Sequence, residues 1–409
     1  MINSIQSDFI NDPTSKKIMS LLNKEGDFAR FVGGCVRDSL INIRTNDIDI
    51  ATKHKPENII EILSSNSIKV IPTGFDHGTV SIFTDTFNFE ITTLRSDTET
   101  DGRHAKVSFT DSWEEDSKRR DFTINSIYLS PNGDIFDPND GTLDLIKRNI
   151  VFIGDPRERI QEDYLRILRY FRFCGYYGDE DMPSSSPALK ACEELSSKLV
   201  NLSPERVQSE FLRILIAPQA KKNIIAMSDA GILKVIFDKP IDFSYFSRMV
   251  DIDHKNQYDL NPILRLVSLI YLQLINCDQL KMFSFSNKQR DLISFLINKK
   301  INFSHKMSKK DLNKNLYFYG SEVCSFKARV CWSNDPDFTN DDKWMGLLSI
   351  IKIWNKPILP IKAEDILKFG VKEGPLLGQI LNEIESRWIA SNFMLDRNFL
   401  LDKIKDLIK

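Results

Sequence analysis

A change in hydrophobic periodicity near residue 155 restricts the fold of this 409-residue chain more than any other feature. Before it, segments 78–84 and 87–94 alternate apolar and polar side chains and are rich in β-branched residues, which is typical of strands separated by a turn. After the Asp155-Pro156 pair, the spacing of apolar residues becomes that of helices and stays so to the end of the chain. We therefore expect a head of strands and helices followed by an all-helical remainder.

This α+β interpretation divides the chain into three parts. Residues 1–150 form the head, which is a small mixed sheet with helices. Residues 151–240 form a helical neck, and residues 241–409 form a helical body and tail. The pattern predicts further short strands at 134–136 and 149–153, and neck helices at 160–173, 187–200, 204–216 and 223–235.

Composition narrows the class of protein. Hydrophobic residues make up 42% of the chain, enough for sizeable cores, and the formal charge of −2 means that any RNA contact must come from local basic patches. The six cysteines show no CxxC spacing, which indicates reduced thiols rather than disulfides or a zinc site. The sequence contains neither a signal-type segment nor an apolar run that could span a bilayer. We expect a cytoplasmic protein with no membrane contact and no obligatory protein partner.

The most specific local pattern lies between residues 31 and 50, FVGGCVRDSLINIRTNDIDI. The pair Gly33-Gly34 permits a tight turn that a ligand can approach closely, and a helix start after it suits phosphate. Strand periodicity then places Asp47 and Asp49 on one face. Adjacent carboxylates repel each other, so the pair predicts cations, and Mg²⁺ prefers such oxygen ligands. The alternatives are an ordinary glycine turn and a solvated strand face.

A third carboxylate follows in the strand predicted at 87–94. Glu90 shares a face with its polar neighbours, opposite Phe89 and Ile91. If this strand lies beside Asp49, the three acids Asp47, Asp49 and Glu90 can act together as catalytic residues, with Asp47 and Asp49 as the metal ligands. Two metal ions that activate a hydroxyl and neutralise a leaving pyrophosphate are the usual arrangement for nucleotidyl transfer.

Further segments complete a family pattern. GG-x-x-RD-x-L followed by D-x-D resembles the polymerase β-type nucleotidyltransferase signature and, more narrowly, the class II tRNA nucleotidyltransferase and bacterial poly(A) polymerase superfamily. The later motifs come in the order of that family, with RRDFTIN at 119–125, DPNDGTLDL at 137–145, EDYLR at 162–166, LSPER at 202–206 and tail segments at 364–367 and 374–378. Asp140-Gly141 departs from the usual glycine pair at the joint of head and neck, and Glu373 stands where proline is common.

The resemblance implies template-independent, Mg²⁺-dependent addition or repair of the 3′-terminal CCA of tRNA from CTP and ATP. It implies that ten residues bind the nucleotide, namely Gly33, Gly34, Arg37, Arg119, Arg120, Asp121, Asn125, Asp163, Arg166 and Arg169.

The EDYLR motif suits the selection of the base. On one continuous helix Asp163 and Arg166 share a face, and Arg169 lies only slightly to the side. Asp163 can accept from the exocyclic amine of cytosine or adenine and Arg166 can donate to the ring acceptors, with discrimination of about 1–3 kcal/mol. The alternative is a simple salt bridge between Asp163 and Arg166.

In RRDFTIN, Arg119 and Arg120 can clamp phosphates, and Asp121 can accept from a ribose hydroxyl. The alternative is a solvated run of charge.

Two other features bear on the substrate. The polar segment from Arg95 to Trp113 matches the mobile loop that the family requires for the final A addition, and its His104 is expected to form loop hydrogen bonds rather than to bind metal. Segment 299–314 holds six lysines against one acid. It suits either backbone contacts to a folded RNA or a solvated helix surface.

Three functions compete. A CCA-adding enzyme fits all the motifs, whereas a poly(A) polymerase or an enzyme that adds only A could use the same scaffold. An RNA-binding protein without catalysis is the second alternative, and the intact acids argue against it. None of the five histidines precedes an aspartate, so we expect no HD phosphohydrolase activity.

Overall fold

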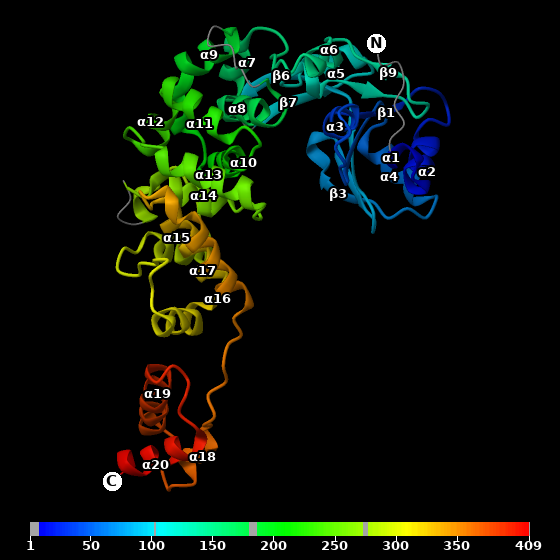
Figure 1. Ribbon diagram of the computed structural model, residues 1–409. Coiled ribbons are helices and arrows are strands. Elements are labelled where there is room, and N and C mark those ends of the chain that lie inside the picture. The colour runs from blue at the N-terminus through cyan, green and yellow to red at the C-terminus, as the bar shows by residue number, and fades with distance from the viewer. Residues whose placement is uncertain (1–7, 102–103, 180–185, 273–276, 409) are drawn as a thin grey trace. The chain divides into compact units, whose positions relative to one another are not determined.

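The computed structural model describes residues 8–101, 104–179, 186–272 and 277–408 (Figure 1). The chain forms two compact units, of which the first comprises Met1–Ile241 with Leu280–Ser284 and the second comprises Asp242–Gln279 with Phe285–Lys409. In the described ranges no helix is long and apolar enough to cross a membrane. The α+β class predicted from periodicity is confirmed, with strands in the head and helices elsewhere.

A seven-stranded mixed sheet forms the head, in the order β3-β4-β5-β2-β1-β8-β9. Strands β2 and β5 pair in parallel, and the other neighbours are antiparallel. The strands are β1 (Ala29–Val32), β2 (Asp47–Thr52), β3 (Ile71–Gly74), β4 (Thr79–Phe83), β5 (Asn88–Thr93), β8 (Tyr128–Leu129) and β9 (Ile135–Phe136).

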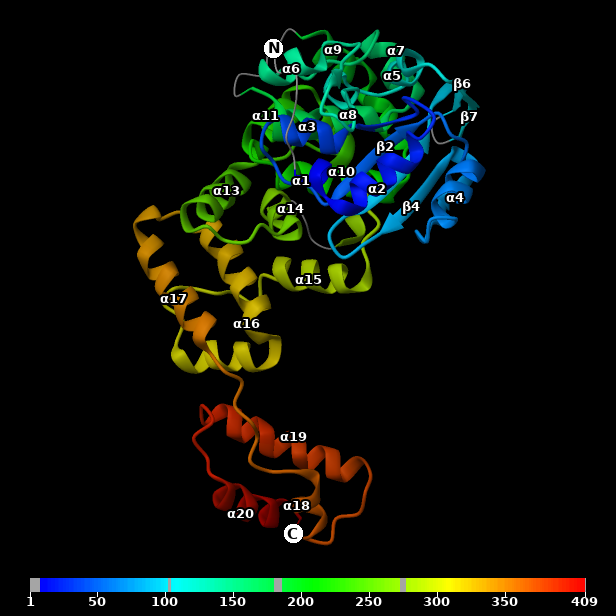
Figure 2. The ribbon, with the colours of Figure 1, turned by 90° about the vertical axis from the view of Figure 1, so that its right-hand side faces the viewer.

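One face of this sheet is buried by helices α2 (Pro13–Leu22) and α4 (Pro56–Ser64) (Figure 2). Helix α2 begins where the side chain of Asp12 accepts two backbone N–H bonds, and Met19 then packs in the same core as Ile48 and Phe89. Because side chains alternate along a strand, this burial directs Asp47 and Asp49 to the opposite face. Further head helices are α1 (Asp8–Asn11), α3 (Gly34–Leu40), α5 (Trp113–Lys118) and α6 (Gly141–Ile146).

The segment that matches the family's mobile loop forms a β-hairpin. Strands β6 (Arg95–Asp101) and β7 (His104–Phe109) pair as a separate two-stranded sheet. Residues 102–103 lie outside the described residues, as do the side chains of 97–107, so the expectation for His104 is untested. The polar, glycine-containing sequence of this segment did not indicate that it would form two strands.

Helices form the rest of the first unit: α7 (Pro156–Glu162), α8 (Leu165–Tyr177), α9 (Pro187–Leu195), α10 (Pro204–Leu215), α11 (Ala220–Asp229) and α12 (Ile232–Phe237). The helices predicted at 160–173 and 223–235 are each broken in two. The break in 223–235 falls at Gly231, whose φ of 71° is left-handed. The strand predicted at 149–153 is wrong, since this segment forms only a bridge between Phe152 and Phe122.

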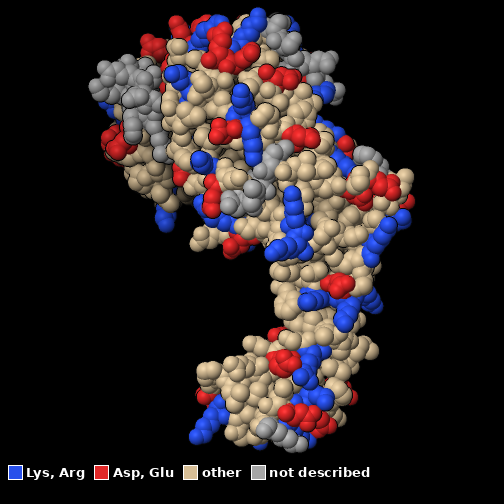
Figure 3. All heavy atoms as spheres, turned by 90° about the vertical axis from the view of Figure 1, so that its left-hand side faces the viewer, with Lys and Arg blue, Asp and Glu red and all other residues tan. Residues whose placement is uncertain are grey.

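The second unit is entirely helical in the residues described. Its helices are α13 (Ser244–Asn256), α14 (Pro262–Ile270), α15 (Asn287–Ile297), α16 (Lys309–Ser333), α17 (Asp341–Ile353), α18 (Ala363–Leu367), α19 (Pro375–Ala390) and α20 (Arg397–Ile408). One core gathers around Trp332 and Trp344, and a second around Trp388 joins α18, α19 and α20. Figure 3 shows basic and acidic side chains interspersed over one face.

Candidate active site

Register between β2 and β5 brings the three predicted acids to one face of the sheet. Asp49 lies directly opposite Glu90, and residues opposite each other in a sheet point to the same side. Asp47 is exposed and accepts a hydrogen bond from Asn88 Nδ2 at 3.0 Å. Within the described ranges, no three acids, histidines or cysteines gather closely enough to enclose a metal ion by themselves.

The charge on Asp49 is poorly compensated. Burial and the neighbouring Glu90 raise the pKa of Asp49 to about 6, although Arg120 opposes the shift. A carboxylate held in this way gains from a cation. This is the electrostatic condition expected of a metal ligand.

The glycine turn packs against this carboxylate. Gly33 ends β1 with φ 72° and ψ −129°, a conformation that favours glycine. A Cβ on Gly33 would lie 3.6 Å from Asp49 Oδ2 and 3.6 Å from Arg120 Nη1, and one on Gly34 would lie 3.9 Å from the same Oδ2. The turn therefore places its own backbone so close to the Asp49 carboxylate and the Arg120 guanidinium that one ligand can contact all three.

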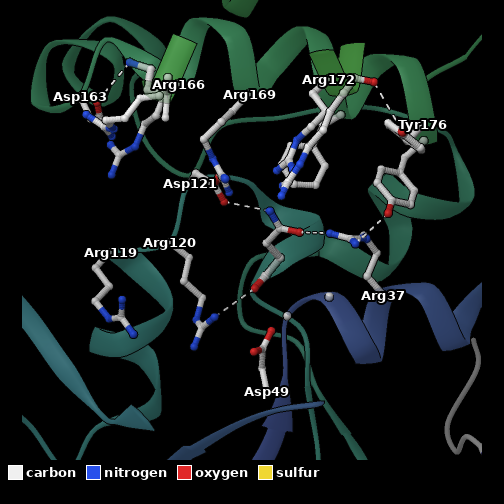
Figure 4. A pocket seen from close by; sticks show the side chains of 18 residues that line it. Arg37, Asp49, Arg119, Arg120, Asp121, Asp163, Arg166, Arg169, Arg172 and Tyr176 are labelled. Carbon is white, nitrogen blue, oxygen red and sulfur yellow. Dashed lines mark hydrogen bonds and ion pairs between the residues drawn. The ribbon is translucent and has the colours of Figure 1, made fainter. Parts of the chain in front are cut away.

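A cavity of about 750 Å³ opens beside Asp49 (Figure 4). All ten predicted nucleotide-binding residues line it, together with Asp49, whereas Asp47 and Glu90 do not. Its charged lining consists of eight arginines and three aspartates, a balance that attracts a polyanion. The charged residues are Arg37, Arg119, Arg120, Arg166, Arg169, Arg172, Arg206, Arg213, Asp49, Asp121 and Asp163.

Asp116 fixes two of these arginines. Its fully buried carboxylate accepts from Arg119 Nε at 2.8 Å, from Arg120 Nη2 at 3.0 Å and from the hydroxyl of Tyr128 at 2.7 Å. It also accepts the backbone N–H of Arg95, at the base of the hairpin, at 3.3 Å. The arginines hold the pKa of Asp116 well below its usual range despite burial. Arg119 and Arg120 are thus not a solvated charge run but are held against the cavity.

A second chain of contacts crosses the cavity wall (Figure 4). Arg169 Nη2 donates to Asp121 at 2.5 Å, and Asp121 accepts from Asn125 Nδ2 at 2.9 Å. Asn125 accepts from Arg37 Nη1, and Arg37 Nη2 donates to the hydroxyl of Tyr177 at 2.7 Å. Arg169 and these hydrogen bonds lower the pKa of Asp121 to about 2 in spite of its burial. The predicted ribose ligand is therefore an ionised acceptor with defined orientation.

The prediction that Asp163 and Arg166 share one continuous helix is wrong. Helix α7 ends at Glu162, and Asp163 is extended, with φ −155° and ψ 107°. Its Oδ1 accepts the backbone N–H of Leu165 at 3.1 Å, a local side-chain contact in the turn that precedes α8. The simple salt bridge is not formed either, because Asp163 pairs with Arg206 at 2.7 Å. Arg166 instead pairs with Glu162 at 2.5 Å.

Seven residues of the cavity were missed by sequence reasoning: Leu165, Arg172, Phe173, Tyr176, Tyr177, Arg206 and Arg213. The sequence spacing of some of these residues could have indicated that they belong to the site. Phe173 and Tyr176 follow Arg169 at four and seven positions along α8, which is the spacing of one helix face. Arg213 follows Arg206 by seven positions on α10 in the same way. The buried Phe173 ring lies within 5.5 Å of the guanidinium carbons of Arg37, Arg169 and Arg172.

Comparison with known proteins shows which family this chain resembles. Residues 29–151 match the family of poly A polymerase head domains, and residues 186–241 match a probable RNA and SrmB- binding site of polymerase A. The mitochondrial CCA tRNA nucleotidyltransferase 1 of Mus musculus is 33% identical over 95% of this chain and 89% of its own. The CCA-adding enzyme of Ligilactobacillus salivarius is 30% identical over 96% and 97%. The crystal structure of the Bacillus stearothermophilus CCA-adding enzyme with CTP shares the fold, with a TM-score of 0.72 at 24% identity over 97% and 98%.

Proposed function

The chain belongs to the family of CCA-adding tRNA nucleotidyltransferases, and we propose that its arginine-lined cavity binds the incoming CTP or ATP. The enzyme adds or repairs the 3′-terminal CCA of tRNA without a nucleic-acid template and releases pyrophosphate. The observation that carries the proposal is the position of Asp49, which lines the cavity and lies opposite Glu90 on the neighbouring strand. Poly(A) synthesis or addition of A alone is the competing activity on the same scaffold.

Asp47 and Asp49 would hold Mg²⁺. Their oxygens are the donor type that this ion prefers, and Mg²⁺ normally takes only one or two carboxylates, with water and substrate phosphates completing its shell. The raised pKa of Asp49 supports this assignment, because a cation would relieve the repulsion from Glu90. When bound, the metal would supply activation of the acceptor hydroxyl and neutralisation of charge on the phosphates. Glu90 adds negative charge beside the pair and thereby favours cation binding.

The triphosphate would lie against the arginines and the Gly33-Gly34 turn. Arg119 and Arg120 come preoriented by Asp116, so little side-chain entropy is lost when they bind phosphate. Asp121, ionised and fixed by Arg169, would accept from a ribose hydroxyl and favour ribonucleotides.

Base selection would fall to Asp163 and Arg166 at the break between α7 and α8. The contacts to Leu165 and Arg206 hold the Asp163 carboxylate in place, and a carboxylate has further lone pairs for the amine of cytosine or adenine. Guanine and uracil would present a carbonyl to the same carboxylate, and this repulsion would exclude them. The basic segment 299–314, with all six lysines exposed, is a proposed contact for the tRNA backbone.

Incubating the purified protein with tRNA that lacks CCA, and with each nucleotide alone or in combination, tests the activity. We expect CC from CTP alone and CCA from CTP with ATP, after which addition stops. Long tails from ATP alone would replace this proposal with poly(A) synthesis. Location in the cytoplasm stays a prediction, since the mouse relative is named as mitochondrial.

Replacing Asp49 with alanine tests the metal assignment. We expect incorporation to fall by at least about three orders of magnitude, since removing the ligand of a catalytic ion costs several kcal/mol. Binding of tRNA, measured by filter retention, should change little. Activity equal to wild type would contradict the role of Asp49.

A further inference from the structure

The cavity leaves a defined side open for the acceptor end of the tRNA. Displacement at phosphorus places the attacking hydroxyl roughly in line with, and opposite to, the leaving pyrophosphate. If the nucleotide occupies the cavity, as proposed above, the hydroxyl must approach Asp49 from outside it. Asp47 and Glu90, which are exposed and do not line the cavity, mark that side.

On this side the sheet continues into a row of three residues. Asp47 lies opposite Asn88, and Asn88 lies opposite Phe83 of β4. Residues opposite each other point to the same face, so Phe83 stands on the face of the catalytic acids. Asn88 Nδ2 donates to Asp47 Oδ1, which links the row directly to the metal-binding pair.

Phe83 is unusual for its surroundings. Its ring is 59% exposed, although the four residues before it on β4, Thr79 to Ile82, are all buried. Exposed aromatic surface contributes little to folding, whereas it is the feature on which proteins stack the bases of single-stranded RNA. The 3′ end of a tRNA that lacks part of its CCA is such a single strand.

We propose that Phe83, Asn88 and Asp47 form an acceptor platform, on which the last base of the tRNA stacks so that its 3′ hydroxyl reaches Asp49. This inference rests on the proposed function and adds a binding site for the second substrate. The base stacks on Phe83, and Asn88 keeps Asp47 oriented beside the hydroxyl. Stacking is tolerant of sequence, which suits an acceptor whose last base changes with each addition.

Steady-state kinetics of Phe83 variants test the platform. Phe83→Ala should raise KM for tRNA lacking CCA about 10-fold or more while KM for CTP stays within about twofold, because a stacked base contributes a substantial share of single-strand affinity. Phe83→Tyr should behave as wild type. Phe83→Leu should raise KM for this tRNA nearly as much as Phe83→Ala does, because leucine keeps apolar surface but has no aromatic face on which a base can stack. With a minihelix of the acceptor arm as substrate, the ratio of the Phe83→Ala KM to the wild-type KM should be the same as with whole tRNA.

Ile146→Ala is the matched control, because Ile146 lies in the same unit and is 61% exposed, but sits on helix α6. It should leave both KM values unchanged. Unchanged KM for tRNA in Phe83→Ala and Phe83→Leu, or an equal rise for CTP, would overturn the platform. The proposed function fails separately, if the wild-type protein adds nothing to the same tRNA.

Discussion

Asp49 shows at the scale of one residue how function and stability oppose each other. Its pKa in the folded protein is about 6, above the ordinary value of 3.8. Between these values the folded state binds more protons than the unfolded state, so this group stabilises the fold at low pH. The contribution is lost as the pH rises through about 6. At neutral pH the protein therefore carries an unrelieved charge in its site.

We expect Asp49→Asn to stabilise the metal-free protein at about pH 7.5 by about 1–2 kcal/mol, because it removes this charge while retaining the shape. Chemical denaturation with chelator present measures the difference. The gain should shrink as the pH falls towards about 4 and also when Mg²⁺ is added to the wild type. A variant less stable than wild type at neutral pH would show that Asp49 is already compensated.

Glycine is required at position 141 because no larger side chain fits there, and not because of its backbone conformation. A Cβ there would lie 2.1 Å from the carbonyl oxygen of Thr123, which cannot rotate away. Asp140 before it adopts a left-handed conformation, with φ 55° and ψ 27°, which costs an aspartate less than most residues. This explains why the family's second glycine is kept here while the first is replaced.

Gly141→Ala should destabilise the protein by about 2–4 kcal/mol, because the backbone must shift to admit the methyl group. Gly346→Ala is the control. Gly346 lies within α17, and a Cβ at that position would meet nothing within 4 Å, so alanine should stabilise by about 0.5–1 kcal/mol. Thermal unfolding followed by circular dichroism compares the two. Equal effects would contradict the steric argument.

At the scale of elements, helix α5 joins the hairpin to the arginine-lined cavity. Its Asp116 receives the N–H of Arg95 from β6 and the guanidinium groups of Arg119 and Arg120. Removing the charge would leave two partly buried arginines without this carboxylate. A short helix thus connects the base of the hairpin to two arginines that line the cavity.

Asp116→Asn should raise KM for both CTP and ATP about 10-fold or more and destabilise the protein by about 3 kcal/mol, since breaking a buried pair leaves uncompensated charge. The contribution of Asp116 to stability is present at neutral pH and lost in acid, because its folded pKa is depressed. Glu114→Gln, an exposed change on the same helix, should alter neither quantity. Unchanged nucleotide KM in Asp116→Asn would limit this residue to a structural role.

Sequence periodicity predicted the elements best where burial alternates regularly. Strand β5 and the side of the sheet on which Asp49 lies follow from such alternation. The break at Asp163 was not predicted, because the apolar pattern does not change there and the turn is marked only by a local contact between the Asp163 side chain and the Leu165 N–H. Pairing of Asp163 with Arg206 joins residues 43 positions apart, and the opposition of Asp49 and Glu90 depends on register. Such contacts depend on tertiary packing, which local pattern does not encode.

At the scale of the whole molecule, the two units are not consecutive in sequence. Leu280–Ser284 belongs to the first unit although helices of the second unit precede and follow it. Its buried Phe283 packs on Phe211 and Phe237, with ring centroids 5.6 Å and 5.8 Å apart. The core that contains Phe211 of α10 and Phe237 of α12 therefore needs a residue supplied from far along the chain.

Phe283→Ala should destabilise the first unit by about 3–5 kcal/mol, the usual cost of removing a buried aromatic ring. Hydrogen exchange should report the loss in α10 and α12, which hold Phe211 and Phe237. Phe318→Ala, at a residue 56% exposed, should change stability by less than about 0.5 kcal/mol. Faster exchange confined to the second unit in Phe283→Ala would contradict this assignment.

Because Leu280–Ser284 belongs to the first unit, the two units cannot be separated by dividing the chain at one position. No single cut yields two intact modules: severing the chain at residue 241 removes the patch around Phe283 from the N-terminal piece and exposes aromatic rings to water. A protein truncated at that boundary would expose apolar surface and aggregate. The first unit is therefore complete only in a chain that extends at least to Ser284.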